Sequence, residues 1–96
     1  MAYFWVTTRT IKPGSREQFE HAWRPAEFPP GLARAYVLFA EDSDEVVGIS
    51  IWDSAEACER YRDSDGEARR EAVMDPFVLE QRSRFYTGRE LSIPGR

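Results

Sequence analysis

The chain has 96 residues and a formal net charge of −4, so we expect one domain, spanning residues 1–96, with its own core. Acidic and basic residues are interspersed, which disfavours nucleic-acid binding because phosphates need a basic face. One cysteine and one histidine exclude an internal disulfide and argue against a zinc site. The apolar start at 2–6 is too short for a signal sequence or a membrane span. A lone thiol fits a reducing compartment, so a cytoplasmic location is expected, with no membrane partner.

The first strand and helix are predicted from residue types and capping signals. Residues 3–10 are rich in aromatic and β-branched side chains, which indicates a strand. Ser15 and Gln18 form a capping-box pattern, so a helix is expected to begin there. Pro25 ends this helix, because its ring clashes with the preceding turn.

A β-hairpin and a second helix are predicted next. The proline-rich loop at 25–31 precedes an apolar run at 32–40, and a short polar turn separates this run from a second one at 45–52. Two strand-like runs so close together favour a hairpin. Asp53 or Ser54 is expected to cap the helix that follows.

The last elements complete a recognisable order. The segment 63–66 is expected to break or bend the second helix, which resumes over 67–74, and residues 77–87 are predicted to form the fourth strand. The order is therefore βαββαβ. With right-handed crossovers it predicts an α+β, ferredoxin-like fold with a four-stranded antiparallel sheet and its helices on one face.

Both faces of the predicted sheet carry large apolar groups. In the third strand Val47, Ile49 and Ile51 lie on one face, and Val46 and Trp52 on the other. Helices can cover only one face, and an open second face would leave an apolar patch larger than soluble monomers usually show. We therefore expect a homodimer that pairs through the sheet face. Alternatively, long side chains and the C-terminal tail cover that face.

Several local features resemble one protein family over nearly the whole chain. They are Ile11-Lys12-Pro13-Gly14, Phe19 in the first helix, Pro30-Gly31 before the second strand, and Trp52-Asp53-Ser54 followed by Glu56-Ala57. Their order and spacing resemble the antibiotic biosynthesis monooxygenase superfamily of dimeric α+β barrels. The resemblance implies that fold, together with one of several roles: cofactor-free oxygenation of phenolic or anthrone-like polyketides, haem degradation, or an unknown role.

The chain departs from this family at positions that matter for chemistry. Many relatives have a histidine in the second helix where this chain has Tyr61. Haem degraders use an asparagine on the first strand, and this chain contains no asparagine, which argues against haem degradation. The resemblance therefore implies a cofactor-independent monooxygenase, without metal or flavin, for an electron-rich aromatic or polyketide-like small molecule. The alternative is a non-catalytic dimeric protein of the same fold that binds a hydrophobic small molecule or serves in assembly.

Two polar residues of the second strand are candidates for catalysis. Arg34 and Tyr36 share one face of the strand, flanked by Leu32 and Leu38. In a half-apolar cavity Arg34 could steady an aromatic anion and Tyr36 could relay a proton. The alternative interpretation is an arginine that reaches an acidic partner and a tyrosine that packs at the rim of the sheet.

Small and aromatic residues predict a pocket for a planar ligand under the helices. Gly48 and Ser50 are small residues on the Trp52 face of the third strand, so they could leave a cavity. We expect the substrate-binding walls to come from Trp5, Trp23, Ser50, Trp52 and Tyr61. Alternatively, these aromatic residues are ordinary core.

Three other groups of residues are assigned no chemistry. His21 lies opposite the apolar face of the first helix, so we expect it to be exposed. Cys58 lies on the buried side of the second helix and is expected to be an inert thiol. The acidic residues of 41–45 lack calcium-loop spacing and are expected to form a solvated turn.

Overall fold

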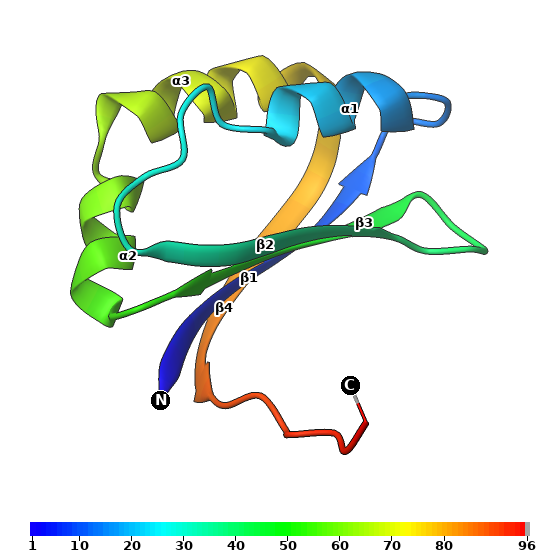
Figure 1. The fold of residues 1–96 in the computed structure, drawn as a ribbon. Helices are drawn as coiled ribbons and strands as arrows, with labels where there is room; N and C mark the ends of the chain where they lie inside the picture. The colour runs from blue at the N-terminus through cyan, green and yellow to red at the C-terminus, as the bar shows by residue number, and fades with distance from the viewer. Residues whose placement is uncertain (96) are drawn as a thin grey trace.

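The computed structural model describes residues 1–95 (Figure 1). Its elements in chain order are β1 Ala2–Ile11, α1 Arg16–Trp23, β2 Leu32–Phe39, β3 Glu45–Trp52, α2 Ala55–Arg62, α3 Asp65–Met74, a 3-10 turn Asp75–Phe77 and β4 Val78–Gly88. All pairings between strands are antiparallel, and the order across the sheet is β2-β3-β1-β4. This is the ferredoxin-like order, so the predicted α+β fold is confirmed.

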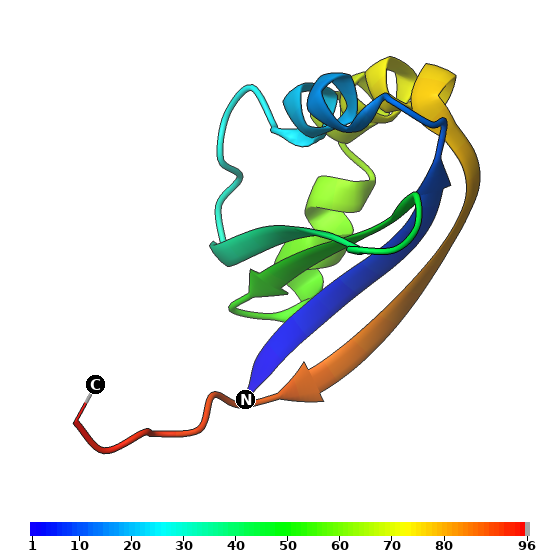
Figure 2. The same cartoon turned by 90° about the vertical axis from the view of Figure 1, so that its right-hand side faces the viewer.

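The three helices lie over one face of the sheet, as Figures 1 and 2 show. Two groups of buried side chains fill the space between the layers. One contains Ile11, Phe19, Ala22, Val46 and Met74, and the other contains Trp5, Trp52, Ala57 and Cys58. The chain leaves β4 as an extended tail that runs away from the layered body (Figure 2).

Serine side chains cap two of the three helices. Ser54 accepts a hydrogen bond from the Ala57 amide at 3.1 Å, and Ser64 accepts one from the Glu67 amide at 3.2 Å. The predicted capping box at the first helix is wrong, because the Ser15 hydroxyl donates backwards to the Lys12 carbonyl at 2.6 Å. That bond closes the turn before α1 and leaves the hydroxyl pointing away from the helix.

The register of the sheet decides which side chains face the helices. Trp5 on β1 is paired with Ser50 on β3, so both point toward the helical layer. The pairing of β2 with β3 shifts between Leu32 and Arg34. A bulge of this kind adds one residue to one strand, and it places Leu32 on the helix side while Arg34 lies on the other side. The expectation that these two residues share a face is therefore wrong.

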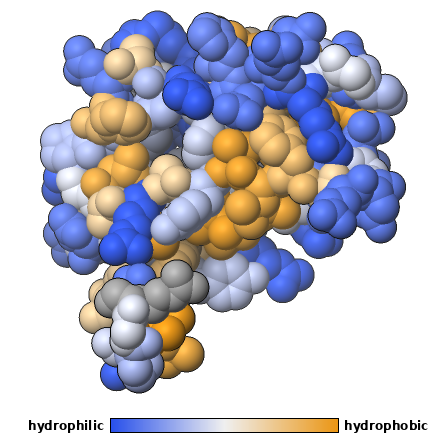
Figure 3. Space-filling model, turned by 45° about the vertical axis from the view of Figure 1, so that its right-hand side comes forward, coloured by the Kyte–Doolittle hydropathy of each residue, from blue (hydrophilic) through white to orange (hydrophobic). Residues whose placement is uncertain are grey.

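The outer face of the sheet, turned away from the helices, is rich in apolar groups. Tyr36 and Leu38 on β2 and Tyr86 on β4 are each 45–49% exposed. A continuous apolar area between the helices and the tail is visible in Figure 3. The tail itself exposes Leu91 and Ile93. Among residues 1–95, no helix is long and apolar enough to cross a membrane.

Candidate functional site

A narrow pocket lies between the sheet and the helices. The residues that line it are Trp5, Thr7, Arg9, Trp23, Pro25, Pro29, Leu32, Ala35, Gly48, Ile49, Ser50, Trp52, Tyr61 and Arg70. Its cavity volume is about 40 Å³, room for a few water molecules. All five predicted wall residues, Trp5, Trp23, Ser50, Trp52 and Tyr61, are in this set, so the structure brings them together at one place.

Hydrogen bonds and ring contacts hold the aromatic walls in place. Trp52 donates from Nε1 to Ser50 Oγ at 2.8 Å, and Trp5 donates to Ser83 Oγ at 3.3 Å. The rings of Trp52 and Tyr61 are 5.5 Å apart between centroids and tilted by 33°. Buried indole nitrogens usually need such a partner. These contacts fix the orientation of Trp5, Trp52 and Tyr61, three of the aromatic residues that line the cavity.

Arg9 brings a positive charge to the pocket from β1. The residue is 4% exposed. Its Nε donates to Gln81 Oε1 at 3.2 Å, and its guanidinium lies 5.6 Å from the centroid of the Phe19 ring. Burial, and then the neighbouring Arg70 charge, lower the pKa of Arg9 to about 10. The side chain is still charged at neutral pH.

A second arginine is neutralised by a buried carboxylate. Arg70 on α3 makes a two-pronged contact with Glu67, at 2.6 and 3.1 Å, and donates from Nη1 to the Trp23 carbonyl at 2.6 Å. The two side chains are 10% and 3% exposed. Burial acts to lower the pKa of Arg70, but the bonds to Glu67 outweigh it and leave the pKa raised. This pair ties α3 to the end of α1 above the pocket.

Tyr61 contributes a phenol hydroxyl group to the pocket. Burial raises its pKa, while Arg70 acts in the opposite direction. At neutral pH the hydroxyl therefore keeps its proton and can serve as a hydrogen-bond donor. The lining side chains together form a largely apolar pocket, in which Arg9 supplies a positive charge and Tyr61 a neutral hydrogen-bond donor.

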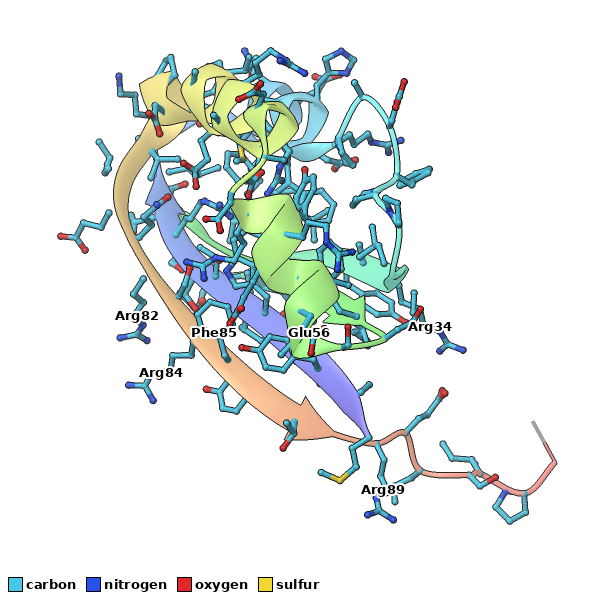
Figure 4. The ribbon with its side chains drawn as sticks, turned by 90° about the vertical axis from the view of Figure 1, so that its left-hand side faces the viewer. Arg34, Glu56, Arg82, Arg84, Phe85 and Arg89 are labelled. Atoms are coloured by element: carbon cyan, nitrogen blue, oxygen red, sulfur yellow. The ribbon has the colours of Figure 1, made fainter. Side chains whose placement is uncertain are left out.

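Arg34 and Tyr36, the pair predicted to be catalytic, do not line this pocket. Both lie on the outer face of the sheet, and Figure 4 shows Arg34 pointing away from the body of the molecule, as do Arg82 and Arg84 of β4. Arg34 Nη1 contacts Glu90 Oε1 at 3.2 Å, with both side chains more than half exposed. Tyr36 and Glu90 raise the pKa of Arg34. This arrangement matches the alternative interpretation of the sequence, in which the arginine reaches an acidic partner.

The residues without assigned chemistry are placed as follows. His21 is exposed on α1. Cys58 is fully buried, and burial raises the pKa of its thiol to about 11, which makes it unreactive at neutral pH. Within residues 1–95, no group of three or more histidine, cysteine, aspartate or glutamate side chains is arranged to hold a metal ion.

Sequence reasoning missed the arginines of the pocket. Arg9 follows Trp5 and Thr7 on the helix-facing side of β1, and Ile11 comes next on that side. A charged residue at an inward position of a strand is unusual, and this alternation was the signal that could have identified it. Glu67 and Arg70 are three residues apart on a helix, a spacing too common to indicate burial.

The fold and pocket define a small α+β protein of ferredoxin-like architecture. The chain belongs to the antibiotic biosynthesis monooxygenase family, whose model matches residues 2–70, and the predicted resemblance is confirmed. Comparison with curated proteins gives no significant match.

Solved structures of the same fold come from distant relatives. SnoaB, a cofactor-independent oxygenase from Streptomyces nogalater, is 23% identical, with 97% of each chain covered and a TM-score of 0.81. A conserved protein from Methanosarcina mazei Go1 is 13% identical, with 93% of this chain and 94% of that chain covered and a TM-score of 0.76. Rv0793 from Mycobacterium tuberculosis is 12% identical, with 97% and 100% covered and a TM-score of 0.75. Similarity at these identities shows a shared fold, which can host different chemistries.

Proposed function

We propose that this protein is a cofactor-independent monooxygenase that acts on an electron-rich aromatic or polyketide-like small molecule. The observation that carries the proposal is the convergence of three tryptophans and Tyr61 on one pocket beside the charged Arg9. Flat aromatic walls suit a planar ring system. Family membership and the likeness to SnoaB, itself a cofactor-independent oxygenase, support the same reading.

The chemistry needs only the substrate and oxygen. A CH₂ group beside aromatic rings loses a proton to bulk water, and the resulting anion transfers one electron to O₂. The carbon radical and superoxide then combine, and protonation gives a hydroperoxide. Loss of water leaves a carbonyl, so that CH₂ and O₂ become C=O and H₂O without an external reductant. The protein's part is to bind the substrate and to stabilise the charge that develops on it.

The proposal gives named residues to these tasks. Arg9 takes the anion-stabilising role that the sequence had suggested for Arg34, because Arg9 lines the pocket and Arg34 lies outside it. The sequence had suggested that Tyr36 relays a proton; we assign Tyr61 the proton-donating part of that role, because its raised pKa keeps the phenol neutral. The catalytic role of the Arg34 and Tyr36 pair stays a prediction, which an Arg34 variant tests.

A ring system can enter the pocket only if part of the chain around it moves. A cavity of about 40 Å³ is far below the roughly 300 Å³ of typical ligand pockets. Pro25 and Pro29, from the loop between α1 and β2, line the pocket. We infer that this loop, residues 24–31, swings outward to admit a ring system and closes behind it, which excludes water from the reacting anion.

Oxygen uptake tests the proposal directly. The wild-type protein, treated with a chelator, is assayed with a panel of anthrones, and uptake above the uncatalysed rate is expected with at least one of them. Arg9→Met should lower that uptake about tenfold or more, because a charge-assisted contact to the anion is lost. No uptake above the uncatalysed rate with any substrate would contradict the enzyme proposal.

The non-catalytic alternative has one observation in its favour. The cavity is small, and the chain's single histidine lies outside it, so no histidine base faces the pocket. A small-molecule-binding or assembly protein of the same fold would have these features. In that case ligands bind, yet oxygen uptake stays at the uncatalysed rate.

A homodimer through the outer sheet face is part of the proposal. Half-buried Val47, Ile49 and Ile51 lie on this face together with the more exposed Tyr36 and Leu38. A second copy packed against this face would remove the exposed parts of these groups from water, whereas the tail runs away from the layered body. We also propose a cytoplasmic location, which the single buried thiol supports.

A further inference from the structure

The pocket contains one arginine whose charge is not neutralised by a direct contact. Among residues 1–95, Arg9 has no ion-pair partner, and its only hydrogen bond goes from Nε to the neutral Gln81. The carboxylates of Glu67, Glu71 and Asp75 act on it only through space. Nη1 and Nη2 of a nearly fully buried side chain are therefore available to a ligand.

Arg70 shows what a neutralised arginine in the same pocket looks like. Its Nε and Nη2 donate to the two carboxylate oxygens of Glu67, and its Nη1 donates to the Trp23 carbonyl. Arg9 and Arg70 are the charged residues that line the pocket, and Glu67 neutralises Arg70 by direct contact, so the lining keeps the positive charge of Arg9 beside the aromatic walls. A guanidinium that is only 4% exposed gains from direct contact with an anion, so we expect a direct partner for Arg9 to come from outside the chain.

A second donor points to the same place as Arg9. A Cβ built on Gly48 would stand 3.5 Å from Arg9 Nη1 and 2.8 Å from Trp23 Nε1. Both nitrogens thus approach one point over the glycine backbone. The indole nitrogens of Trp5 and Trp52 are bonded to serines, whereas within the described chain Trp23 Nε1 has no hydrogen-bond partner.

We propose that Arg9 and the indole N–H of Trp23 bind the carboxylate of a planar, acid-bearing ligand above Gly48. This inference rests on the proposed function in taking the pocket as the ligand site, and it adds the chemical class of the ligand. A carboxylate carries its charge before any reaction, so it matches a permanent cation in the resting site. Its two oxygens suit two donors from different residues.

Binding of a matched pair of single-ring probes tests the inference. Benzoate and benzamide have nearly the same shape and differ in charge, and a single ring needs a smaller opening of the 24–31 loop than a larger ring system does. Each is titrated into ¹⁵N-labelled wild-type protein while the three indole N–H signals are followed by NMR. Benzoate is expected to bind at least about tenfold more tightly than benzamide, with the largest shift at the Trp23 indole, which gains an acceptor.

Variants assign the preference to Arg9. In Arg9→Met, which keeps an unbranched apolar stem but removes the charged guanidinium, benzoate and benzamide should bind equally. Arg9→Lys should restore part of the preference, because the charge returns without the planar fork. Arg60→Met, which removes an exposed charge on α2, is the matched control and should keep the wild-type preference.

The outcomes separate this inference from the proposed function. Equal binding of the two probes to the wild-type protein would overturn the inference, whatever happens to the variants. So would a preference that survives in Arg9→Met, a Trp23 signal that does not move, or no binding of either probe. Absence of oxygen uptake would overturn the monooxygenase proposal alone, because the carboxylate preference is measured without turnover.

Discussion

Trp23 Nε1 lies 2.8 Å from the point where a side chain on Gly48 would begin. The indole of α1 can reach over β3 only because this strand position has no Cβ. The same gap lets the Arg9 guanidinium approach from β1. A glycine in the middle of a strand is usually unfavourable, and here it makes room for the two side chains that give the pocket its polar character.

Gly48→Ala should therefore lower stability and block the pocket. The added Cβ is closer to Trp23 than real Cβ atoms come, so the indole must move, at a cost of about 1–3 kcal/mol. Urea unfolding measures the cost. Gly66→Ala is the matched control, since its nearest atom is 3.8 Å away and alanine in a helix should stabilise by about 0.5–1 kcal/mol. Equal stability of wild type and Gly48→Ala would contradict the close approach.

Breaking the buried pair should cost more than breaking an exposed one. Glu67→Ala leaves Arg70 charged and buried, so we expect the free energy of unfolding to fall by about 3–5 kcal/mol. Glu20→Ala breaks the exposed contact with Arg24 and should cost less than about 1 kcal/mol. Thermal or urea unfolding of both variants gives the comparison.

The double variant Glu67→Leu/Arg70→Met tests whether the loss comes from an uncompensated charge. It should recover a substantial part of the loss, because no charge remains unpaired. A double variant less stable than Glu67→Ala would show instead that the pair contributes a large net stabilisation.

Stability should decline at alkaline pH because of Cys58. Burial raises the pKa of its thiol from 9.0 to about 11, so the folded state holds the proton more tightly than the unfolded chain. This contribution to stability is complete below about pH 9 and is lost as the pH rises to about 11. Tyr61, whose pKa burial also raises, adds a loss of the same sign.

Urea unfolding between pH 8 and 10.5 measures this decline. Cys58→Ala should show a shallower decline than the wild type, even if its stability at pH 8 is lower. An identical pH dependence in the two proteins would exclude the thiol as its cause.

Arg34→Ala should leave oxygen uptake and benzoate binding within about twofold of the wild type. The side chain is on the outer face, and its contact with Glu90 is more than half exposed, so its removal should leave stability nearly unchanged. A tenfold loss of uptake in a folded Arg34→Ala protein would return Arg34 to the catalytic set and would contradict the assignment to Arg9.

Light scattering after gel filtration tests the dimer. The wild-type protein should have about twice the 11.1 kDa mass of one chain, and Leu38→Glu should shift it toward the monomer by placing a charge in the apolar contact. Val73→Glu, at an exposed position on α3, is the control and should not change the mass. A wild-type mass near that of one chain at micromolar concentration would refute the dimer.

The residue pattern alone predicts the element order and the two faces of most strands. The alternation of residues placed Trp5, Ser50 and Trp52 on the helix side, and the spacing on the helices turned Trp23 and Tyr61 toward them. These are local properties, because the side-chain period of a strand or helix follows from its backbone geometry. The walls of the pocket could therefore be named before the structure was known.

The positions of the charged side chains follow from how the sheet and the helices pack together. A bulge between Leu32 and Arg34 places Arg34 on the outer face. No residue type in β2 predicts the extra residue of this bulge. The pairing of Arg70 with Glu67, and the approach of Arg9 to Trp23 over Gly48, depend on how α1 and α3 pack against the sheet. Such contacts join residues far apart in the chain, so their energies arise only when the layers are assembled.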